Sequence, residues 1–325
     1  MGDGAGAAGL LRERRSAREL ALELCRRVHR SPAKRTALVL ATTKGDLAPL
    51  TESARDNAPS LAAGSRPGAL AAMLALELRI DGPAFAVSNA CASGLVAIVS
   101  AARLLERGAA ERALVIGVDV LSPFIVDGFA SLGALDSKPC RPYDSSRAGL
   151  SLGEGAGVML LTRDSNGAVA AVRGYGLSND ANHITGPSRD GAELAAAIHG
   201  ALSMSEWAPR DIHCINGHGT GTEYNDEMEA KALGLAFGDA QPPLTSLKGA
   251  IGHTLGAAGI VEAAIMLRAL RDGVAPGTHG FSERGVSVPV NVSASARTIR
   301  DGRNLLAIKS GFGGVNAAVC FEVLR

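Results

Sequence analysis

The chain has 325 residues, a hydrophobic content of 46% and a net charge of +1. These values suit one large globular domain or two medium ones and exclude a strongly basic nucleic-acid-binding protein. The 5 cysteines are dispersed and odd in number, so neither a disulfide framework nor a metal site is expected. No apolar run approaches the roughly 20 residues that span a membrane, and no secretory signal follows the basic N-terminus, so a cytoplasmic protein without membrane attachment is predicted.

The predicted elements begin with a helix and then alternate between strands and helices. An arginine-rich helix covers about residues 10–30 and ends near Pro32. Apolar runs then predict strands at about 36–43, 84–90, 113–119 and 157–163, with helices at about 67–79 and 91–107. A long loop is expected between the last two of these strands.

From about residue 166 the same order of elements recurs. Strands are predicted at about 168–178 and 213–217, at the start of 244–271, and in the two closing segments NLLAIKSG and AAVCFEVL. Helices are predicted after Pro187, at 225–237 and in the rest of 244–271. This alternation indicates a largely parallel α/β fold with two similar halves, 1–165 and 166–325.

Two matching strand-to-helix turns, called elbows here, carry reactive side chains. One begins at Cys91 and the other at His253, and each has a glycine three positions on, Gly94 and Gly256, before an Ala-rich helix. Matching elbows could place both helix N-termini in one cleft. The alternative is that Ala- and Gly-rich helices resemble one another without a structural repeat.

Cys91 is the candidate nucleophile. A thiol at the first turn of a helix faces unpaired N–H groups and the positive end of the helix dipole, which predicts a lowered pKa. Small neighbours around it would let a substrate carbonyl approach. The alternative is a buried small hydrophobic residue, the usual role of a free cysteine.

Two histidines accompany this thiol in glycine-rich contexts. His218 lies in NGHGTGTEYND, where Thr220 and Thr222 could present hydroxyls to a ligand, and His253 lies in LKGAIGHTLGAAG. No local signature shows the acidic partner that a hydrolytic Cys–His pair needs, and no HxxxH pair indicates zinc. Two neutral imidazoles beside a thiolate suit hydrogen-bond donation to a developing enolate.

Six segments of the chain carry a recognisable pattern. They are SNACASG around Cys91, RPYDSSRAGLSLGEGAG (141–157), SNDANHITGP (178–187), NGHGTGTEYNDEMEA (216–230), SLKGAIGHTLGAAG (246–259) and SGFGGVNA (310–317). In content, order and spacing they resemble the β-ketoacyl-acyl-carrier-protein synthases, the condensing enzymes of type II fatty-acid and polyketide synthesis. The resemblance runs from about residue 36 to the C-terminus.

The resemblance implies a thiolase-like fold of five α/β/α/β/α layers, built from two halves with mixed five-stranded sheets. It implies decarboxylative Claisen condensation of an acyl thioester with malonyl-acyl-carrier protein, with no cofactor beyond the carrier's phosphopantetheine. It also implies a dimer with a second copy or a related subunit, formed through the strand at 84–90. The implied site residues are Cys91 as acyl acceptor, His218 and His253 at the malonyl unit, Lys248 with Glu262, the N–H groups of Cys91 and Phe312 as oxyanion hole, Phe312 as gate, and Thr220 and Thr222 at pantetheine.

Two departures from the family accompany this resemblance. The family's first strand is replaced here by the basic helix, which leaves the strand at 157–163 as an edge that needs a cover. Ser310 stands where many relatives have an aromatic residue, which bears on the acyl pocket and the gate. The basic helix is interpreted either as that cover or as a docking surface for an acidic carrier protein.

Two other functions fit the same family resemblance. A non-catalytic chain-length factor pairs with ketosynthases but characteristically lacks the cysteine, whereas Cys91 is present here. A CoA-dependent thiolase shares the fold, but the HGTGT and GHTLGAAG segments favour the carrier-protein enzymes.

Overall fold

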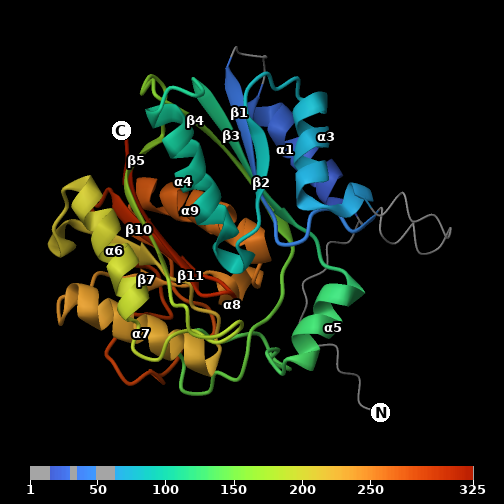
Figure 1. Cartoon of the computed structure of the whole chain (residues 1–325). Helices are drawn as coiled ribbons and strands as arrows, with labels where there is room; N and C mark the ends of the chain where they lie inside the picture. The colour runs from blue at the N-terminus through green and yellow to red at the C-terminus, as the bar shows by residue number, and fades with distance from the viewer. Residues whose placement is uncertain (1–14, 30–34, 49–62, 325) are drawn as a thin grey trace.

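The computed structural model describes residues 15–29, 35–48 and 63–324, and two mixed β-sheets form its centre (Figure 1). The first sheet has four strands in the order β2-β1-β3-β4. Strands β2 and β3 pair in parallel with β1, and β4 is antiparallel to β3. The bounds are β1 Thr36–Ala41, β2 Ala84–Val87, β3 Arg112–Asp119 and β4 Gly155–Thr162.

The second sheet has five strands in the order β5-β11-β10-β6-β7. Strands β7 and β10 pair in parallel with β6, whereas β11 is antiparallel to both β10 and β5. The bounds are β5 Ala170–Asn179, β6 Cys214–Asn216, β7 Leu244–Thr245, β10 Asn304–Ser310 and β11 Val315–Val323. A separate ribbon joins β8 (Val274–Ala275) to β9 (Arg297–Thr298). The expected strands are thus confirmed, but each sheet is mixed.

The helices form three layers, one between the two sheets and one on the outer face of each sheet (Figure 1). Helices α4 (Ser93–Glu106) and α9 (Ala258–Arg271) lie between the sheets, in a core with residues of both. Helices α1 (Ala17–Val28) and α3 (Pro67–Glu77) cover the outer face of the first sheet, and α6 (Ala192–Ser205) and α7 (Glu223–Phe237) that of the second. The five-layer thiolase-like architecture is confirmed, while the division into units at residue 165 stays a prediction.

The residues of β1 show why the first sheet needs helices on both faces. Every side chain of this strand is buried. Ala37 and Val39 join the core shared with α4 and α9, and Leu38 and Leu40 join the core under α1 and α3. Since successive strand residues point to opposite faces, a continuous apolar run requires cover on both sides.

A glycine pair joins the two central helices, and it corrects the predicted register of the repeat. A Cβ on Gly94 would lie 2.8 Å from Cα of Gly259, so these helices approach backbone to backbone only because both residues are glycine. The short 3-10 turns η2 (Ala90–Ala92) and η4 (Leu255–Ala257) precede them. Gly94 therefore matches Gly259 and not Gly256. The repeat is present, with His253 lying before its elbow.

One helix, α5 (Pro123–Ser131), occupies part of the segment for which a long loop was predicted. None of its residues is buried, although the sequence PFIVDGFAS is rich in apolar residues. A helix is predicted from apolar and polar residues that alternate with the helical period, and this short, mostly apolar segment shows no such alternation. The prediction of an uninterrupted loop was wrong.

Helix α1 packs on a face of the first sheet, beside its open edge. Its Ala21, Leu22 and Cys25 are buried against side chains of β3 and β4, and Ser16 and Glu19 form a capping box. The position beside β4 that corresponds to β5 in the second sheet holds no strand among the described residues. The helix thus covers the face next to this edge and leaves the edge itself unpaired within residues 15–324 as described.

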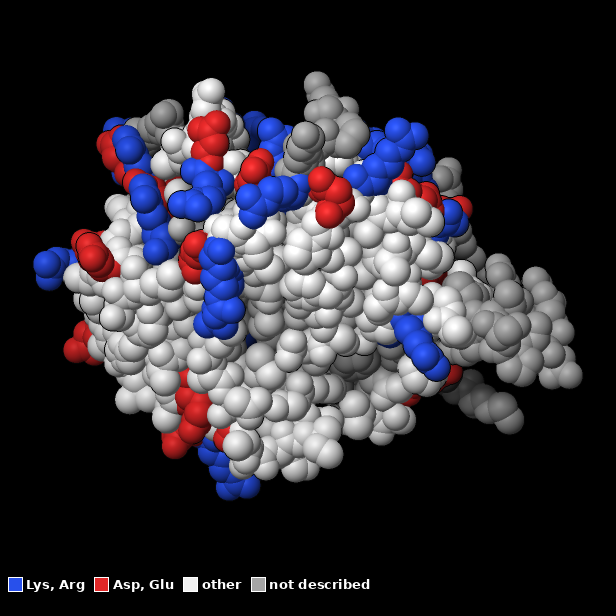
Figure 2. Space-filling view, turned by 45° about the horizontal axis from the view of Figure 1, so that its top comes forward, with Lys and Arg blue, Asp and Glu red and all other residues white. Residues whose placement is uncertain are grey.

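Ion pairs engage three arginines on or directly before α1. Arg15 and Arg27 both pair with Glu23, and Arg18 pairs with Glu77 of α3. Figure 2 shows Lys and Arg side chains interleaved with Asp and Glu along the upper rim of the molecule. Carrier-protein docking on the predicted helix stays a prediction, and residues 10–14 and 30 of that helix lie outside the described part. No helix in residues 15–29, 35–48 and 63–324 is long and apolar enough to cross a membrane.

Candidate active site

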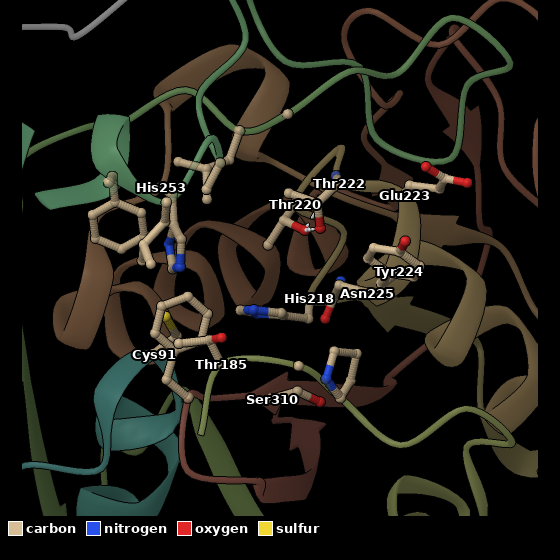
Figure 3. A pocket seen from close by; sticks show the side chains of 18 of the residues that line it. Cys91, Thr185, His218, Thr220, Thr222, Glu223, Tyr224, Asn225, His253 and Ser310 are labelled. Atoms are coloured by element: carbon tan, nitrogen blue, oxygen red, sulfur yellow. Dashed lines mark hydrogen bonds between the residues drawn. The ribbon is translucent and has the colours of Figure 1, made fainter. Parts of the chain in front are cut away.

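Three chain segments bring Cys91, His218 and His253 into one cavity of about 540 Å³ (Figure 3). Cys91 lies in η2, His218 follows β6, and His253 follows the short helix α8 (Lys248–Ile251). The thiol sulfur and one nitrogen of each imidazole all lie within 4.8 Å of one another. The two rings meet edge to face, with centroids 5.4 Å apart. The three side chains that the motifs singled out therefore share one reaction volume.

Both elbows hold a non-glycine residue in the left-handed region. Ala90, directly before Cys91, has φ of 46°, and Leu255 has φ of 54°. At the first elbow the Ser93 hydroxyl donates to the Ala90 carbonyl at 2.6 Å and accepts from the Asn89 N–H at 2.8 Å. A positive φ costs on the order of 1–3 kcal/mol at such residues, which is typical of functional turns that the surrounding structure holds in place.

The environment of Cys91 corrects the expected thiol pKa. Burial raises the pKa of the Cys91 thiol to about 12, although the nearby Lys248 ammonium acts in the opposite direction. Loss of hydration therefore outweighs the helix N-terminus in the unliganded site. The prediction of a lowered pKa was wrong for this state, and the thiol must lose its proton during the reaction.

Both imidazoles are held neutral. Burial, reinforced by the Lys248 ammonium, keeps the pKa of His218 and of His253 well below the usual histidine range. The Leu255 N–H donates to Nδ1 of His253 at 3.3 Å, so the proton of the neutral ring resides on Nε2. That Nε2 is buried and has no hydrogen-bond partner within the described chain. It is a fixed donor that faces the cavity.

The same tautomer bears on metal binding. Cys91, His218 and His253 are close enough to hold a metal ion. A histidine ligand needs a lone pair on the coordinating nitrogen, and the Leu255 N–H already uses the lone pair of His253 Nδ1. The ring therefore suits hydrogen-bond donation through Nε2 better than coordination.

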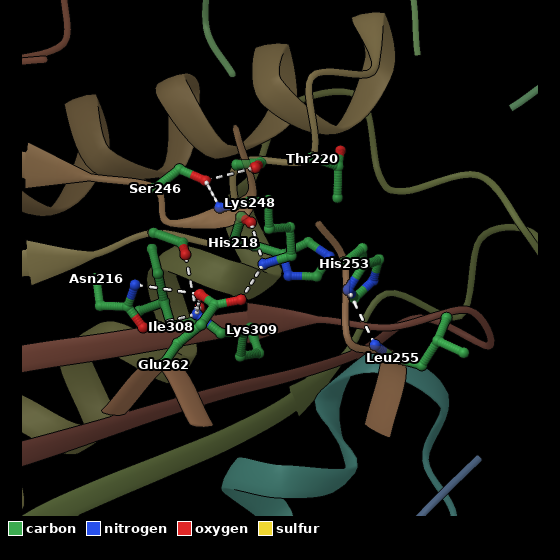
Figure 4. A network of polar contacts seen from close by, with 12 residues as sticks. Asn216, His218, Thr220, Ser246, Lys248, His253, Leu255, Glu262, Ile308 and Lys309 are labelled. Carbon is green, nitrogen blue, oxygen red and sulfur yellow. Dashed lines mark hydrogen bonds and ion pairs between the residues drawn. The ribbon is translucent and has the colours of Figure 1, made fainter. Parts of the chain in front are cut away.

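A buried polar cluster supports His218 from behind (Figure 4). Lys248 Nζ donates to the His218 carbonyl at 2.6 Å and to Glu262 Oε1 at 2.7 Å. Glu262, whose pKa burial alone would raise, is brought to a pKa of about 2 by Lys248 and Lys309. The expected Lys248–Glu262 pair thus lies behind the imidazole and holds its backbone.

Three further members of this cluster escaped the sequence analysis. The Glu229 carboxylate accepts the N–H groups of His218 and Gly219, and Asn216 bridges Lys309 and Glu262. Lys309 is fully buried at the end of β10. A lysine within the apolar segment NLLAIKSG was the one available signal, because an unpaired charge does not persist in a core.

The loop after His218 places both predicted threonines on the cavity wall. Thr220 and Thr222 share a hydrogen bond of 2.8 Å between their hydroxyl oxygens, and both line the cavity. Asp226 accepts the N–H groups of Thr220 and Gly221, which holds this loop in shape. Both threonines therefore lie on the cavity wall, and their contact with pantetheine stays a prediction.

The glycine-rich loop after β10 lies against the nucleophile elbow. A Cβ on Gly311 would stand 2.8 Å from the Asn89 carbonyl oxygen and 3.3 Å from the Cys91 nitrogen, so this loop reaches the elbow only without a side chain there. The next residue, Phe312, is 36% exposed and stacks on Phe129 of α5 with ring centroids 5.9 Å apart. This places the Phe312 ring at the cavity wall, where the expected gate would act.

Ser310, at the position where the family resemblance led us to expect an aromatic residue, takes part in a polar network. Its hydroxyl donates to Asn316 Oδ1 at 2.7 Å, and Asn316 in turn donates to Asp180. Ser310 and Asp180 both line the cavity. The cavity wall is therefore polar at Ser310 and Asp180.

The chain is similar in sequence to known proteins. Models of the β-ketoacyl synthase N-terminal and C-terminal domains match residues 19–167 and 169–282. Nodulation protein E of Rhizobium meliloti is 33% identical over 81% of this chain and 70% of its own length. The 3-oxoacyl-[acyl-carrier-protein] synthase 2 of Vibrio cholerae serotype O1 is 35% identical over 78% of this chain, which spans 65% of that relative's length.

Solved structures agree with these matches. The ketosynthase ApeO, in complex with its chain length factor ApeC from Xenorhabdus doucetiae, superposes with a TM-score of 0.84 and 31% identity. The match covers 94% of this chain and 79% of that one. The fold, the six motifs and these similarities together show that the chain belongs to the β-ketoacyl synthase family.

Proposed function

We propose that the chain is a β-ketoacyl-acyl-carrier-protein synthase that condenses an acyl thioester with malonyl-acyl-carrier protein. The observation that carries the proposal is the single cavity in which the Cys91 thiol and two neutral imidazoles lie within 4.8 Å of one another. A nucleophile and two donors at this spacing suit a reaction with a covalent acyl intermediate and an enolate. The chain's own residues and the carrier's phosphopantetheine suffice for it.

In the first half-reaction the Cys91 sulfur attacks the carbonyl carbon of the acyl thioester. The bond between that carbon and the donor sulfur breaks, and the Cys91 proton ends on the leaving thiolate. Because burial raises the pKa of this thiol, its proton must leave the sulfur before or during the attack. The N–H groups of Cys91 and Phe312 receive the carbonyl oxygen while it carries negative charge.

In the second half-reaction the malonyl unit loses its carboxylate as carbon dioxide. The electron pair of the broken bond becomes an enolate, whose oxygen accepts hydrogen bonds from His218 and His253. The enolate carbon then attacks the Cys91 thioester, and the released thiolate regains a proton from solvent. Each neutral imidazole donates an N–H hydrogen bond to the enolate oxygen. Burial, which lowers the pKa of both rings, favours this neutral form.

The test is incubation with acyl-loaded carrier protein, followed by malonyl-loaded carrier protein, with intact-protein mass spectrometry at each step. We expect acyl mass on the chain, then its loss as β-ketoacyl carrier protein appears. A chain-length factor would acquire no acyl mass. A thiolase would release product with an acetyl thioester in place of the malonyl one.

We further propose that the chain pairs with a second thiolase-fold subunit through β2. This strand is the edge of the first sheet, and Phe85 on it is 36% exposed. The solved complex of ApeO with ApeC is a ketosynthase beside a chain length factor, so the partner is either a second copy or such a subunit. Analytical ultracentrifugation is expected to give a dimer at micromolar concentration that Phe85→Arg dissociates. A wild-type monomer would leave only the pairing of different subunits, which co-purification with a chain length factor tests.

A further inference from the structure

Lys309 is a second fully buried lysine behind the active site, and it does not line the cavity. Its ammonium donates to Asn216 Oδ1 and to the Gly217 carbonyl, both at 2.9 Å, and lies 3.0 Å from Glu262 Oε2 (Figure 4). The next residue along the strand, Ser310, already lines the cavity. Lys309 thus stands one residue from the reaction volume with its charge directed away from solvent.

Packing does not explain a lysine at this position. Neighbouring residues of β10, such as Leu306 and Ile308, are apolar and fully buried. Burying an ammonium costs several kcal/mol that an ion pair only partly offsets. Glu262 already has a cationic partner in Lys248, and the other carboxylate that attracts Lys309 is Glu229, which accepts the His218 and Gly219 N–H groups. A second cation at such a site indicates a role beyond stability.

The contacts of Lys309 converge on the segment that carries His218. Lys309 holds the Gly217 carbonyl, Lys248 holds the His218 carbonyl, and Glu229 accepts the N–H groups of the same two peptide groups, those of His218 and Gly219. The two consecutive peptide groups on either side of the His218 Cα are therefore fixed by side chains from β10, α8 and α7. A displacement of this segment would move the imidazole relative to Cys91.

The charge of Lys309 acts on the histidines as well. Besides burial and Lys248, the Lys309 ammonium contributes to keeping the pKa of His218 low, and it does the same for His253. Burial lowers the pKa of Lys309 itself to about 8, against the attraction of Glu262. The titratable groups packed around His218, besides Lys309, are Cys91, Tyr143, Glu229, Lys248, His253 and Glu262.

We propose that Lys309 is a positioning residue for His218, which it holds through the Gly217 carbonyl. The Lys309 ammonium also adds to the burial and to the Lys248 charge that lower the pKa of this imidazole. The inference rests on the proposed function, because it assigns Lys309 to the decarboxylation step. It acts through His218 and touches no substrate.

The test compares Lys309→Met with Leu306→Met, which places the same new side chain on the opposite face of the strand. Lys309→Met keeps the Lys248–Glu262 pair, so a folded protein is expected. Malonyl decarboxylation should fall about tenfold to a hundredfold, since a catalytic group displaced by about 1 Å can cost a hundredfold in rate. Acylation of Cys91 should stay within about twofold of wild type, and Leu306→Met should match wild type in both half-reactions.

The pH profile separates positioning from a purely structural effect. Removal of a cation raises the pKa of a neighbouring imidazole, so the neutral form is lost at a higher pH than in wild type. The acid limb of decarboxylation should therefore move to higher pH in Lys309→Met and stay in place in Leu306→Met. If Lys309→Met does not fold, Lys309→Gln, which keeps a donor and lacks the charge, is measured for the same limb.

The inference is overturned if the folded Lys309 variant matches wild type in both half-reactions and its acid limb lies at the same pH. The proposed function would stand in that case, because wild-type condensation is unaffected. Absence of decarboxylation in wild type would instead overturn the proposed function. The two failures are distinct because the wild-type protein is measured in the same series.

Discussion

Cys91→Ala is expected to abolish condensation and to remove acyl mass from the protein. Covalent catalysis passes through a bond to this sulfur, and within the described residues no other cysteine lines the cavity. The loss should reach the detection limit, at least about a thousandfold, since the step has no alternative acyl acceptor. Intact-protein mass spectrometry after incubation with acyl-carrier protein measures it, with peptide mapping to place the acyl group.

The matched control is Cys25→Ala, which removes a buried thiol on α1, remote from the cavity. This variant should become acylated like wild type, apart from any loss of stability. Turnover by Cys91→Ala, or acyl mass on Cys25, Cys140, Cys214 or Cys320, would contradict the assignment of the nucleophile.

Substitution of either active-site histidine by alanine is expected to suppress malonyl decarboxylation about a hundredfold to a thousandfold. Loss of one fixed donor to a developing oxyanion costs about this much. The effect on acylation of Cys91 should be smaller, because the enolate forms only in the second half-reaction. Release of carbon dioxide from labelled malonyl-carrier protein measures the one step, and acyl mass on the protein measures the other.

An exposed histidine supplies the control for these two variants. His199 lies on α6, outside the cavity, and the variant His199→Ala should match wild type in both steps. Equal and mild losses in both half-reactions for His218→Ala or His253→Ala would show that the imidazoles are structural.

Because burial lowers the pKa of both rings, the rate of wild-type decarboxylation should also be constant from about pH 8 to about pH 6, where an ordinary histidine titrates.

The sequence by itself determined the fold class and the residues that meet in the cavity. Apolar runs such as TALVLA predict strands because each residue must be buried on one face or the other, and the structure has β1 at that place. Cys91, His218 and His253 stand out because each lies among glycines or at the start of a helix. Their immediate neighbours in the chain are enough to suggest a chemical role for these reactive side chains. Local patterns of this kind need no knowledge of distant residues.

Only the tertiary structure decided the properties that depend on distant neighbours. The Cys91 thiol was expected to have a lowered pKa from its helix start, yet burial by other segments raises it. The repeat was matched by spacing from Cys91 and His253, whereas the close approach of Gly94 and Gly259 sets its register.

The support for His218 is nonlocal for the same reason. Lys309 lies 93 positions from Asn216 along the chain, and its ammonium meets that side chain only because β10 pairs with β6. Desolvation and ion pairing depend on which segments pack together, and a single sequence does not show that packing. The reacting groups can therefore be identified from the sequence, while the fold sets their protonation states and holds them in place.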